Sequence, residues 1–145
     1  MESTIDRIGA WAALLRVHAA LVPKLERALA RTGLPIAWYD ALLVLNAAPG
    51  RRLRMSELGA RAVLSRERIS RVVGELKTAG LVTRERNPDD KRSWFATITP
   101  EGRKRLRAAA PVYLAAVERH YTDHLSDRDV VTISTALQRV LDAEE

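Results

Sequence analysis

Arginine and serine side chains cluster in the middle of the chain, and their chemistry suits an anionic polymer. Arg66, Arg68 and Arg71 lie within six residues, with Ser65 and Ser70 beside them. A guanidinium pairs with a phosphate or with two acceptors of one guanine, and a serine hydroxyl bonds to phosphates or bases. These residue types predict nucleic-acid binding. The alternative is a solvated basic face that has no partner.

The overall charge balance points the same way. The 145 residues carry 24 Lys and Arg against 18 Asp and Glu, and 15 of the basic but only seven of the acidic residues lie in 51–105. The basic excess is therefore confined to one central segment, as expected of a nucleic-acid-binding module inside a larger scaffold. Cysteine is absent, which excludes disulfides, thiolate metal sites and cysteine nucleophiles.

The central cluster is predicted to lie on a helix that follows another helix after a tight turn. Apolar residues at three- and four-residue steps form the core stripe of this helix: Ile69, Val72, Val73 and Leu76. Ser65 is placed to cap its start, and Gly80 to end it in the left-handed conformation. The preceding short helix is expected to be capped by Ser56, and the turn to fall at Val63 and Leu64. Helix, tight turn and helix is a DNA-binding arrangement.

Gly74 interrupts the second of these helices. A glycine inside a helix costs about 1 kcal/mol relative to alanine. We expect close packing of a neighbouring helix, or of the DNA backbone, to compensate.

A charged β-hairpin is predicted after these helices. Residues 81–86 and 93–98 alternate as strands do, and Asn-Pro-Asp-Asp between them is a turn sequence. Lys91 and Arg92 lie at the tip, with Arg84 and Arg86 on the first strand. A narrow minor groove attracts such side chains.

The remaining segments are expected to be helical, so the fold class is mainly α with a small β-hairpin. A long apolar helix ends near Gly33 and Pro35, and Thr99-Pro100 starts another. Ser126 and Asp129 form a capping box for the last helix. We expect a single domain over 1–145, no signal peptide and no uninterrupted apolar run of about 18 residues that could cross a membrane. This predicts a soluble cytoplasmic protein.

Five sequence blocks together resemble the MarR family of bacterial transcriptional regulators. They are MSELG (55–59), SRERISRVV (65–73), LKTAGLV (76–82), RERNPDDKR (84–92) and ITPEG (98–102). The resemblance covers nearly the whole chain, and the fourth block is its most specific part. Asn87 stands where many members have Asp, and Lys91 where Arg is common.

The resemblance implies a winged helix-turn-helix lobe at 35–99, flanked by dimerisation helices at 1–34 and 100–145. A homodimer would bind a pseudo-palindromic double-stranded DNA operator, with helix 65–79 in the major groove and wing 84–98 at the minor groove. Members usually repress a gene and release DNA on binding a small aromatic or anionic effector. The implied DNA-binding residues are Ser65, Arg66, Arg68, Ser70, Arg71, Arg86, Asp90, Lys91 and Arg92. Asp90 would brace the wing by pairing with an arginine.

The family also suggests where an effector binds. The helices that surround the family's effector pocket carry Trp11, His18, Trp38, Tyr39 and Tyr113 in this chain. Core packing is the alternative for each of them, and Arg16 is a further candidate partner for an anion. His120 and His124, four residues apart, could face one metal ion, but a complete ligand set is not visible. We therefore expect no metal and no cofactor.

Three other classes of function compete with that of a ligand-responsive regulator. An enzyme is not supported, since the chain has three histidines, no glycine-rich phosphate loop and no H-E-x-x-H motif. A ligand-independent architectural DNA-binding protein and a winged-helix protein–protein adaptor both remain open.

Overall fold

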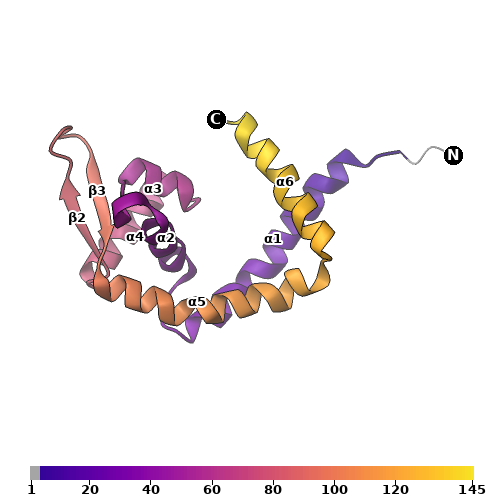
Figure 1. The fold of residues 1–145 in the computed structure, drawn as a ribbon, viewed down its shortest axis with the longest axis horizontal. Helices are drawn as coiled ribbons and strands as arrows, with labels where there is room; N and C mark the ends of the chain where they lie inside the picture. Colours follow the sequence, from indigo (N-terminus) through magenta and orange to yellow (C-terminus); the bar gives the residue numbers. More distant parts are fainter. Residues whose placement is uncertain (1–3) are drawn as a thin grey trace. The chain divides into compact units, whose positions relative to one another are not determined.

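The computed structural model describes residues 4–145, and residues 1–3 of the expected first segment lie outside them. Six α-helices and three short strands follow one another along this part of the chain (Figure 1). In chain order the elements are α1 (Arg7–Ala30), α2 (Ile36–Ala47), the 3₁₀ turn η1 (Pro49–Arg51), β1 (Arg52–Arg54), α3 (Met55–Arg61), α4 (Arg66–Thr78), β2 (Val82–Arg86), β3 (Trp94–Ile98), α5 (Pro100–His120), the 3₁₀ turn η2 (Thr122–His124) and α6 (Asp127–Ala143). The mainly helical class with a β-hairpin wing is confirmed.

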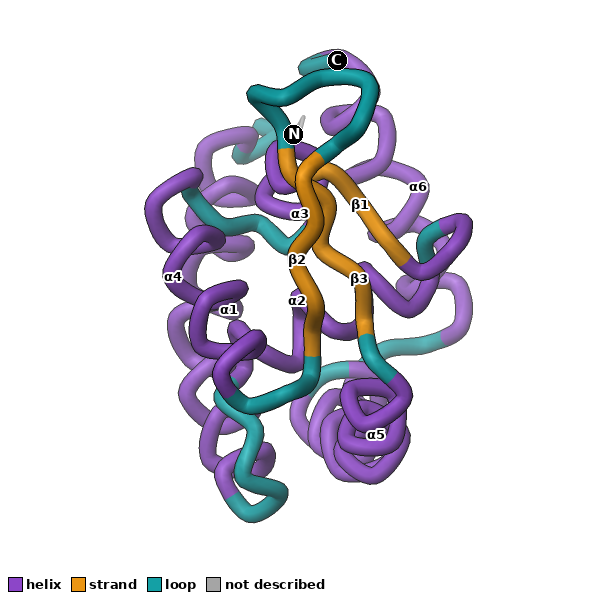
Figure 2. Tube along the Cα trace, turned by 90° about the vertical axis from the view of Figure 1, so that its left-hand side faces the viewer, coloured by secondary structure: helices purple, strands orange, loops and turns teal. Residues whose placement is uncertain are grey.

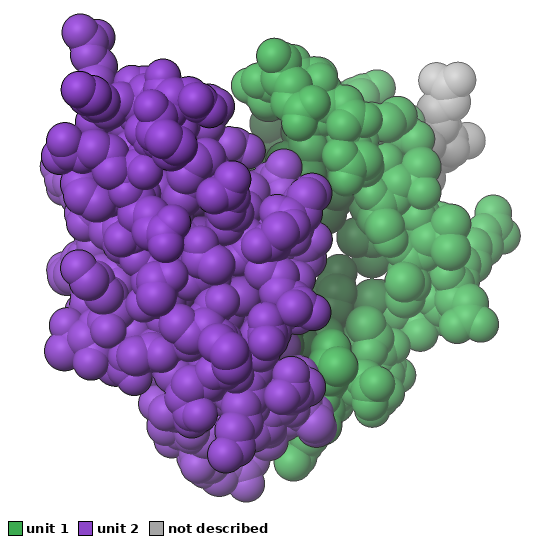
Figure 3. Space-filling view, turned by 60° about the vertical axis from the view of Figure 1, so that its left-hand side comes forward, with its two compact units in different colours: residues 1–27, 113–145 green, residues 28–112 purple. Residues whose placement is uncertain are grey.

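The chain groups into two compact units, coloured separately in Figure 3. Residues 28–112 form one unit, and residues 1–27 with 113–145 form the other. The boundaries fall inside α1 and α5. The predicted division into a lobe at 35–99 and dimerisation helices at 1–34 and 100–145 concerns an assembly, and it stays a prediction.

A three-stranded antiparallel sheet organises the unit of residues 28–112. β3 lies in the middle, between β1 and β2 (Figure 2). Val82 pairs with Ile98 and Arg84 with Ala96, so one face of the hairpin is apolar at its base and basic toward its tip. β1 was not predicted, and its partner residues show that Leu53 lies opposite Ala96. The three-residue strand is too short for an alternation pattern to reveal.

The core of this unit draws on every one of its helices. Its most deeply buried large side chains are Leu29, Leu34, Tyr39, Leu42, Leu45, Leu58, Val73, Leu76, Leu81 and Val82. Burial of this many apolar side chains supplies the main driving force that holds the sheet against the helices.

The unit of residues 1–27 and 113–145 has almost no core within a single chain. Ala116 is its one buried residue among those described. Large apolar side chains of α1 and α6 stay more than half exposed: Ile8, Trp11, Leu15, Val131, Val140 and Leu141. Large apolar side chains exposed in such number on two helices are typical of an interaction surface.

α1 is long and apolar enough to cross a membrane by length and composition alone. The expectation that no apolar run reaches about 18 residues concerned unbroken runs. α1 meets the criterion by its mean hydropathy, although Arg16 and a few other charges are spread through it. A helix that packs against protein satisfies the same criterion, so it is weak evidence for a membrane span.

Candidate nucleic-acid interface

α4 presents a basic face because its apolar stripe is fully committed to the core. Ile69, Val72, Val73 and Leu76 are at most 4% exposed. The Ser65 side chain accepts a hydrogen bond from the Arg68 backbone N–H at 3.3 Å, which caps the helix start as predicted. The helix then ends at Thr78, and Gly80 takes the expected left-handed conformation with φ of 77°. The side chains opposite the stripe therefore point to solvent in a defined orientation.

All five α4-region residues predicted to contact DNA lie on this exposed side: Ser65, Arg66, Arg68, Ser70 and Arg71. Over residues 4–145 the single ion pair joins Arg54 and Glu57, at 4.0 Å. The guanidiniums of α4 therefore form no ion pair with any carboxylate in the described part of the chain. An array of exposed, unpaired guanidiniums on a helix is suited to phosphates and guanine edges.

The helix-turn-helix differs from the prediction at two points. α3 begins at Met55 with Arg54 in the capping position, so Ser56 lies inside the helix and does not cap it. Among residues 4–145 no neighbouring helix packs closely on Gly74, because a Cβ at this position would meet nothing within 4 Å; the alternative, packing against the DNA backbone, stays a prediction. The turn itself falls at Val63 and Leu64 as predicted, with Val63 at a φ of 57°.

The wing turn is stabilised by short-range hydrogen bonds around two side chains. Asn87 is 2% exposed, and its side-chain oxygen accepts the Asp89 N–H at 3.0 Å. The Asp90 carboxylate accepts the Arg92 backbone N–H at 3.0 Å. Because Asn87 is buried and already satisfies the turn, an uncharged side chain fits here in place of the family's Asp.

Asp90 does brace the wing, but not in the expected way. It acts through the Arg92 backbone, and within the described part of the chain its carboxylate forms no ion pair with an arginine side chain. Lys91 and Arg92 at the tip are exposed, as is Arg86 on β2. The wing therefore carries its positive charges on a preformed turn.

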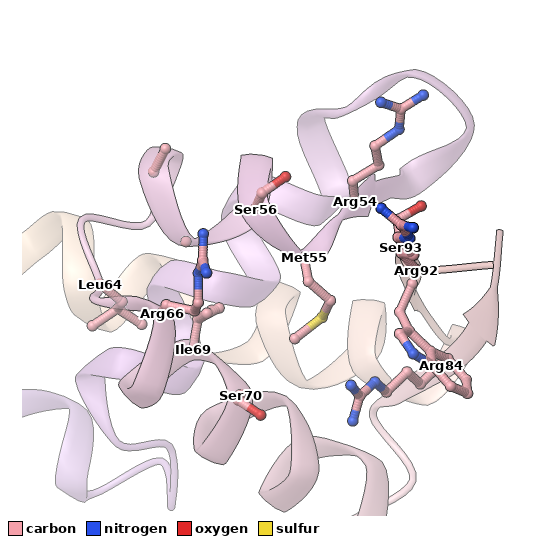
Figure 4. Close-up of a pocket in the computed structure, with 13 residues that line it drawn as sticks. Arg54, Met55, Ser56, Leu64, Arg66, Ile69, Ser70, Arg84, Arg92 and Ser93 are labelled. Carbon is pink, nitrogen blue, oxygen red and sulfur yellow. The ribbon is translucent and has the colours of Figure 1, made fainter. Parts of the chain in front are cut away.

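A cavity of about 510 Å³ lies between α3, the start of α4 and the wing (Figure 4). Four arginines line it: Arg54, Arg66, Arg84 and Arg92. Three serines, Ser56, Ser70 and Ser93, also line it, and no carboxylate does. Sequence reasoning did not select Arg54 or Ser56 as site residues. The signal for Arg54 was the Arg-Arg-Leu-Arg run, in which arginines flank one buried leucine.

The five effector-pocket candidates divide between the two units. Tyr39 is 2% exposed and belongs to the core of residues 28–112. Trp38 donates its indole N–H to the Glu75 carboxylate at 2.7 Å and lines a shallow hollow on α4. Trp11, His18 and Tyr113 belong to the other unit, where Trp11 is 59% exposed.

That second unit has a hollow of its own, of about 540 Å³. It is lined by Ala13, Arg16, Val17, Ala20, Leu21, His120, Tyr121, His124 and Leu125. Desolvation, followed by the positive charges of Lys24 and Arg119, holds the pKa of His120 below its usual value. Across residues 4–145 no group of three or more His, Cys, Asp or Glu is placed to hold a metal ion. Trp11, His18 and Tyr113 do not line this hollow.

Comparisons with known proteins agree on one family. A profile described as MarR family matches residues 32–93. The HTH-type transcriptional repressor Rv2887 of Mycobacterium tuberculosis is 34% identical over 106 residues, which cover 73% of this chain and 75% of that protein. The structure of Sco3205, a MarR family transcriptional regulator from Streptomyces coelicolor in complex with DNA, matches with a TM-score of 0.87 and 33% identity over 100% and 92% of the two chains. CouR from Rhodococcus jostii RHA1, bound to p-coumaroyl-CoA, matches with a TM-score of 0.78 and 30% identity over 95% of each chain.

Proposed function

The chain belongs to the MarR family of DNA-binding transcriptional regulators, and on that premise we propose that it is a homodimeric repressor that a small effector releases from its operator. It is a regulator and not an enzyme. The observation that carries the proposal is the set of exposed guanidiniums on α4, Arg66, Arg68 and Arg71, which have no ion-pair partner in residues 4–145.

We propose that α4 occupies the major groove. The first turns of a recognition helix reach the base edges, and the three arginines and Ser70 lie in those turns. Because the core stripe fixes the rotation of α4 about its axis, the same side chains face outward in every copy. Ser65, at the helix start, is placed to contact a phosphate.

We propose that the wing enters the neighbouring minor groove. Its tip carries Lys91 and Arg92 on a turn that Asn87 and Asp90 pre-organise. A lysine cannot form the planar two-point contact of an arginine, so Lys91 is assigned to a phosphate and Arg92 to the groove.

We propose that a second copy of the chain covers the apolar surface of α1 and α6. That surface includes Trp11, which is 59% exposed, and Val140 and Leu141, which are each 60% exposed. Two lobes held in this way would contact half-sites about one helical turn apart. Operator DNA lies in the cytoplasm, which is where we place the protein.

The proposal of repression and release follows the relatives. Rv2887 is named as a repressor, and CouR is bound to p-coumaroyl-CoA in its structure. We propose an effector with an aromatic or anionic group, and Trp11, His18, Trp38 and Tyr113 stay candidates for contacting it. Tyr39 is a candidate only where a movement of the core exposes it, because it is 2% exposed.

Fluorescence anisotropy tests the proposal on two duplexes, one from upstream of the protein's own gene and one scrambled. We expect binding to the upstream duplex that is tighter by about 10³-fold, with an affinity that falls steeply as salt rises. Equal binding to both duplexes would indicate an architectural role instead. Absence of binding to either duplex at low salt would refute DNA binding.

A pair of charge reversals isolates α4. Arg71→Glu is expected to weaken binding by about 10- to 100-fold, because a good arginine–base contact contributes that much discrimination. Arg107→Glu on α5 makes the same change in net charge away from α4 and the wing, and it is the matched control. An adaptor that does not use DNA would show no such difference.

A further inference from the structure

Trp94 contacts two arginines of the neighbouring strand. It is the first residue of β3 and pairs with Arg86 of β2. The guanidinium carbons of Arg84 and Arg86 lie 4.9 Å and 5.0 Å from its ring centroid. Both distances are within the range of a cation–π interaction, for which tryptophan is the strongest aromatic partner.

This arrangement compensates for a local conflict of charge. Arg84 and Arg86 are two residues apart on one strand, so their side chains lie on the same face. Like charges on neighbouring sheet positions repel each other. The negative face of the indole attracts both cations and restricts two long side chains that would otherwise sample many rotamers.

Arg84 is also left with unused hydrogen-bonding capacity. Its Nε is buried and has no hydrogen-bond partner within residues 4–145. The side chain lines the cavity between α4 and the wing, where Arg66 comes from α4 and Arg84 comes from β2 (Figure 4). Since four arginines and no carboxylate line this cavity, the groups that best suit the cavity are anionic oxygens.

The place of the cavity indicates which anion that is. α4 is assigned to a major groove and the wing to the adjacent minor groove, and one sugar–phosphate backbone separates two adjacent grooves of a duplex. The cavity between α4 and the wing therefore faces that backbone. A guanidinium held there meets a DNA phosphate.

We propose that Arg84 contacts a DNA phosphate between the two grooves and that Trp94 is the residue that positions it. This inference rests on the proposed function. It adds Trp94, which the sequence did not point to, and it assigns Arg84 to a phosphate instead of to the minor groove that the sequence suggested for it. Arg84 binds the DNA, whereas Trp94 acts through Arg84 and touches no DNA itself.

A double-mutant cycle tests the coupling between the two residues. DNA affinity is measured by anisotropy at several salt concentrations for the wild type, Trp94→Leu, Arg84→Gln and the double variant. Arg84→Gln is expected to weaken binding about tenfold and to reduce the salt slope by about one phosphate contact. Trp94→Leu is expected to weaken binding about fivefold, and the double variant to bind no more weakly than Arg84→Gln alone.

Two controls separate positioning from a general loss of structure. Trp94→Phe keeps an aromatic face and is expected to retain most of the affinity, which preserves the test if Trp94→Leu folds poorly. Phe95, the next residue of β3, lies on the face opposite to Trp94, and its ring centroid is 4.3 Å from the guanidinium carbon of Arg52. Phe95→Leu removes this second aromatic ring and is expected to leave the salt slope unchanged. Thermal unfolding of each variant confirms that the folded protein is being compared.

The outcomes distinguish this inference from the function on which it rests. The inference would be overturned if Trp94→Leu bound DNA with the affinity and salt slope of the wild type. It would also be overturned if the losses of binding free energy of the two single variants added up in the double variant. The assignment to Arg84 would be overturned if Trp94→Leu still weakened DNA binding in an Arg84→Gln background but no longer did so in an Arg86→Gln background. If the wild type binds neither duplex, the proposed function fails and the inference fails with it.

Discussion

Gly102 allows α5 to begin directly against the base of the wing, and its replacement by alanine should be severely destabilising. A Cβ on Gly102 would overlap the Leu81 carbonyl oxygen and lie 2.8 Å from Ile98 Cγ1. The Leu81 oxygen cannot easily move away, since it accepts the Thr99 N–H at 3.0 Å. The Thr99 side chain in turn accepts the Gly102 N–H at 3.0 Å and donates to the Gly80 carbonyl at 2.8 Å.

The size of the destabilisation depends on which atoms must move to make room for the new methyl group. Overpacking of a core by a methyl group costs typically 1–3 kcal/mol, and the first obstacle here is a hydrogen-bonded backbone atom instead of a flexible side chain. We therefore expect Gly102→Ala to lower the free energy of unfolding by about 3 kcal/mol or more. This is a large share of the stability of an ordinary domain.

Gly74 on α4 is the matched control. It also lies in a helix, but an added Cβ meets nothing within 4 Å. Gly74→Ala should raise the free energy of unfolding by about 1 kcal/mol, the difference in helix propensity. The same substitution thus has opposite signs at two helical glycines, and the difference between them is about 4 kcal/mol.

Urea unfolding followed by circular dichroism measures both variants at one protein concentration, because dimerisation would make stability depend on concentration. The urea midpoint should be highest for Gly74→Ala, intermediate for the wild type and lowest for Gly102→Ala. A Gly102→Ala midpoint equal to that of the wild type would show that α5 and the wing base are not packed as described.

Three further predictions concern turns and caps. Val63→Gly should raise the free energy of unfolding by about 1 kcal/mol, since a β-branched residue is strained at a φ of 57° and its side chain is 88% exposed; an unchanged urea midpoint would contradict this. Ser65→Ala should lower the free energy of unfolding by about 1 kcal/mol, because it removes the cap of α4. The same unfolding assay measures this, and a loss no larger than that of a Ser→Ala substitution at an exposed position outside a cap would contradict it. Hydrogen bonds from the Ser126 backbone and side chain lower the pKa of Asp129, so the stability that they add is present above the pKa of the unfolded state and is lost as pH falls through the pKa of the folded state. Ser126→Ala should therefore raise the pKa of Asp129 in an NMR titration. An unchanged pKa would exclude the hydroxyl as a cause.

Most of the secondary structure could be predicted because it is encoded by neighbouring residues. Ser65 caps α4, Ser126 and Asp129 form the capping box of α6, and Thr99-Pro100 starts α5, all as predicted. These signals act over three or four residues, so no tertiary information is needed to recognise them. The two wing strands were equally accessible, since alternation and turn chemistry are local.

The errors share a different origin, in contacts between distant residues. β1 exists because Leu53 packs opposite Ala96, more than forty residues later. Ser56 was predicted as a cap, but α3 follows β1 directly and its capping position is Arg54, two residues earlier. The burial of Tyr39 in the core of residues 28–112 was likewise beyond local sequence patterns, which left core packing and effector contact both open.

The sequence by itself determined a basic winged-helix layout, because charge, capping residues and apolar periodicity are properties of single segments. The regulatory function was implied by the resemblance of its sequence blocks to the MarR family. Only the tertiary structure brought Arg54, Arg66, Arg84 and Arg92 around one cavity. It also placed Trp94 against both arginines of β2, since strand register decides which side chains meet across a hairpin. Such register depends on which turn the chain forms and on which faces are buried, and those are properties of the folded whole.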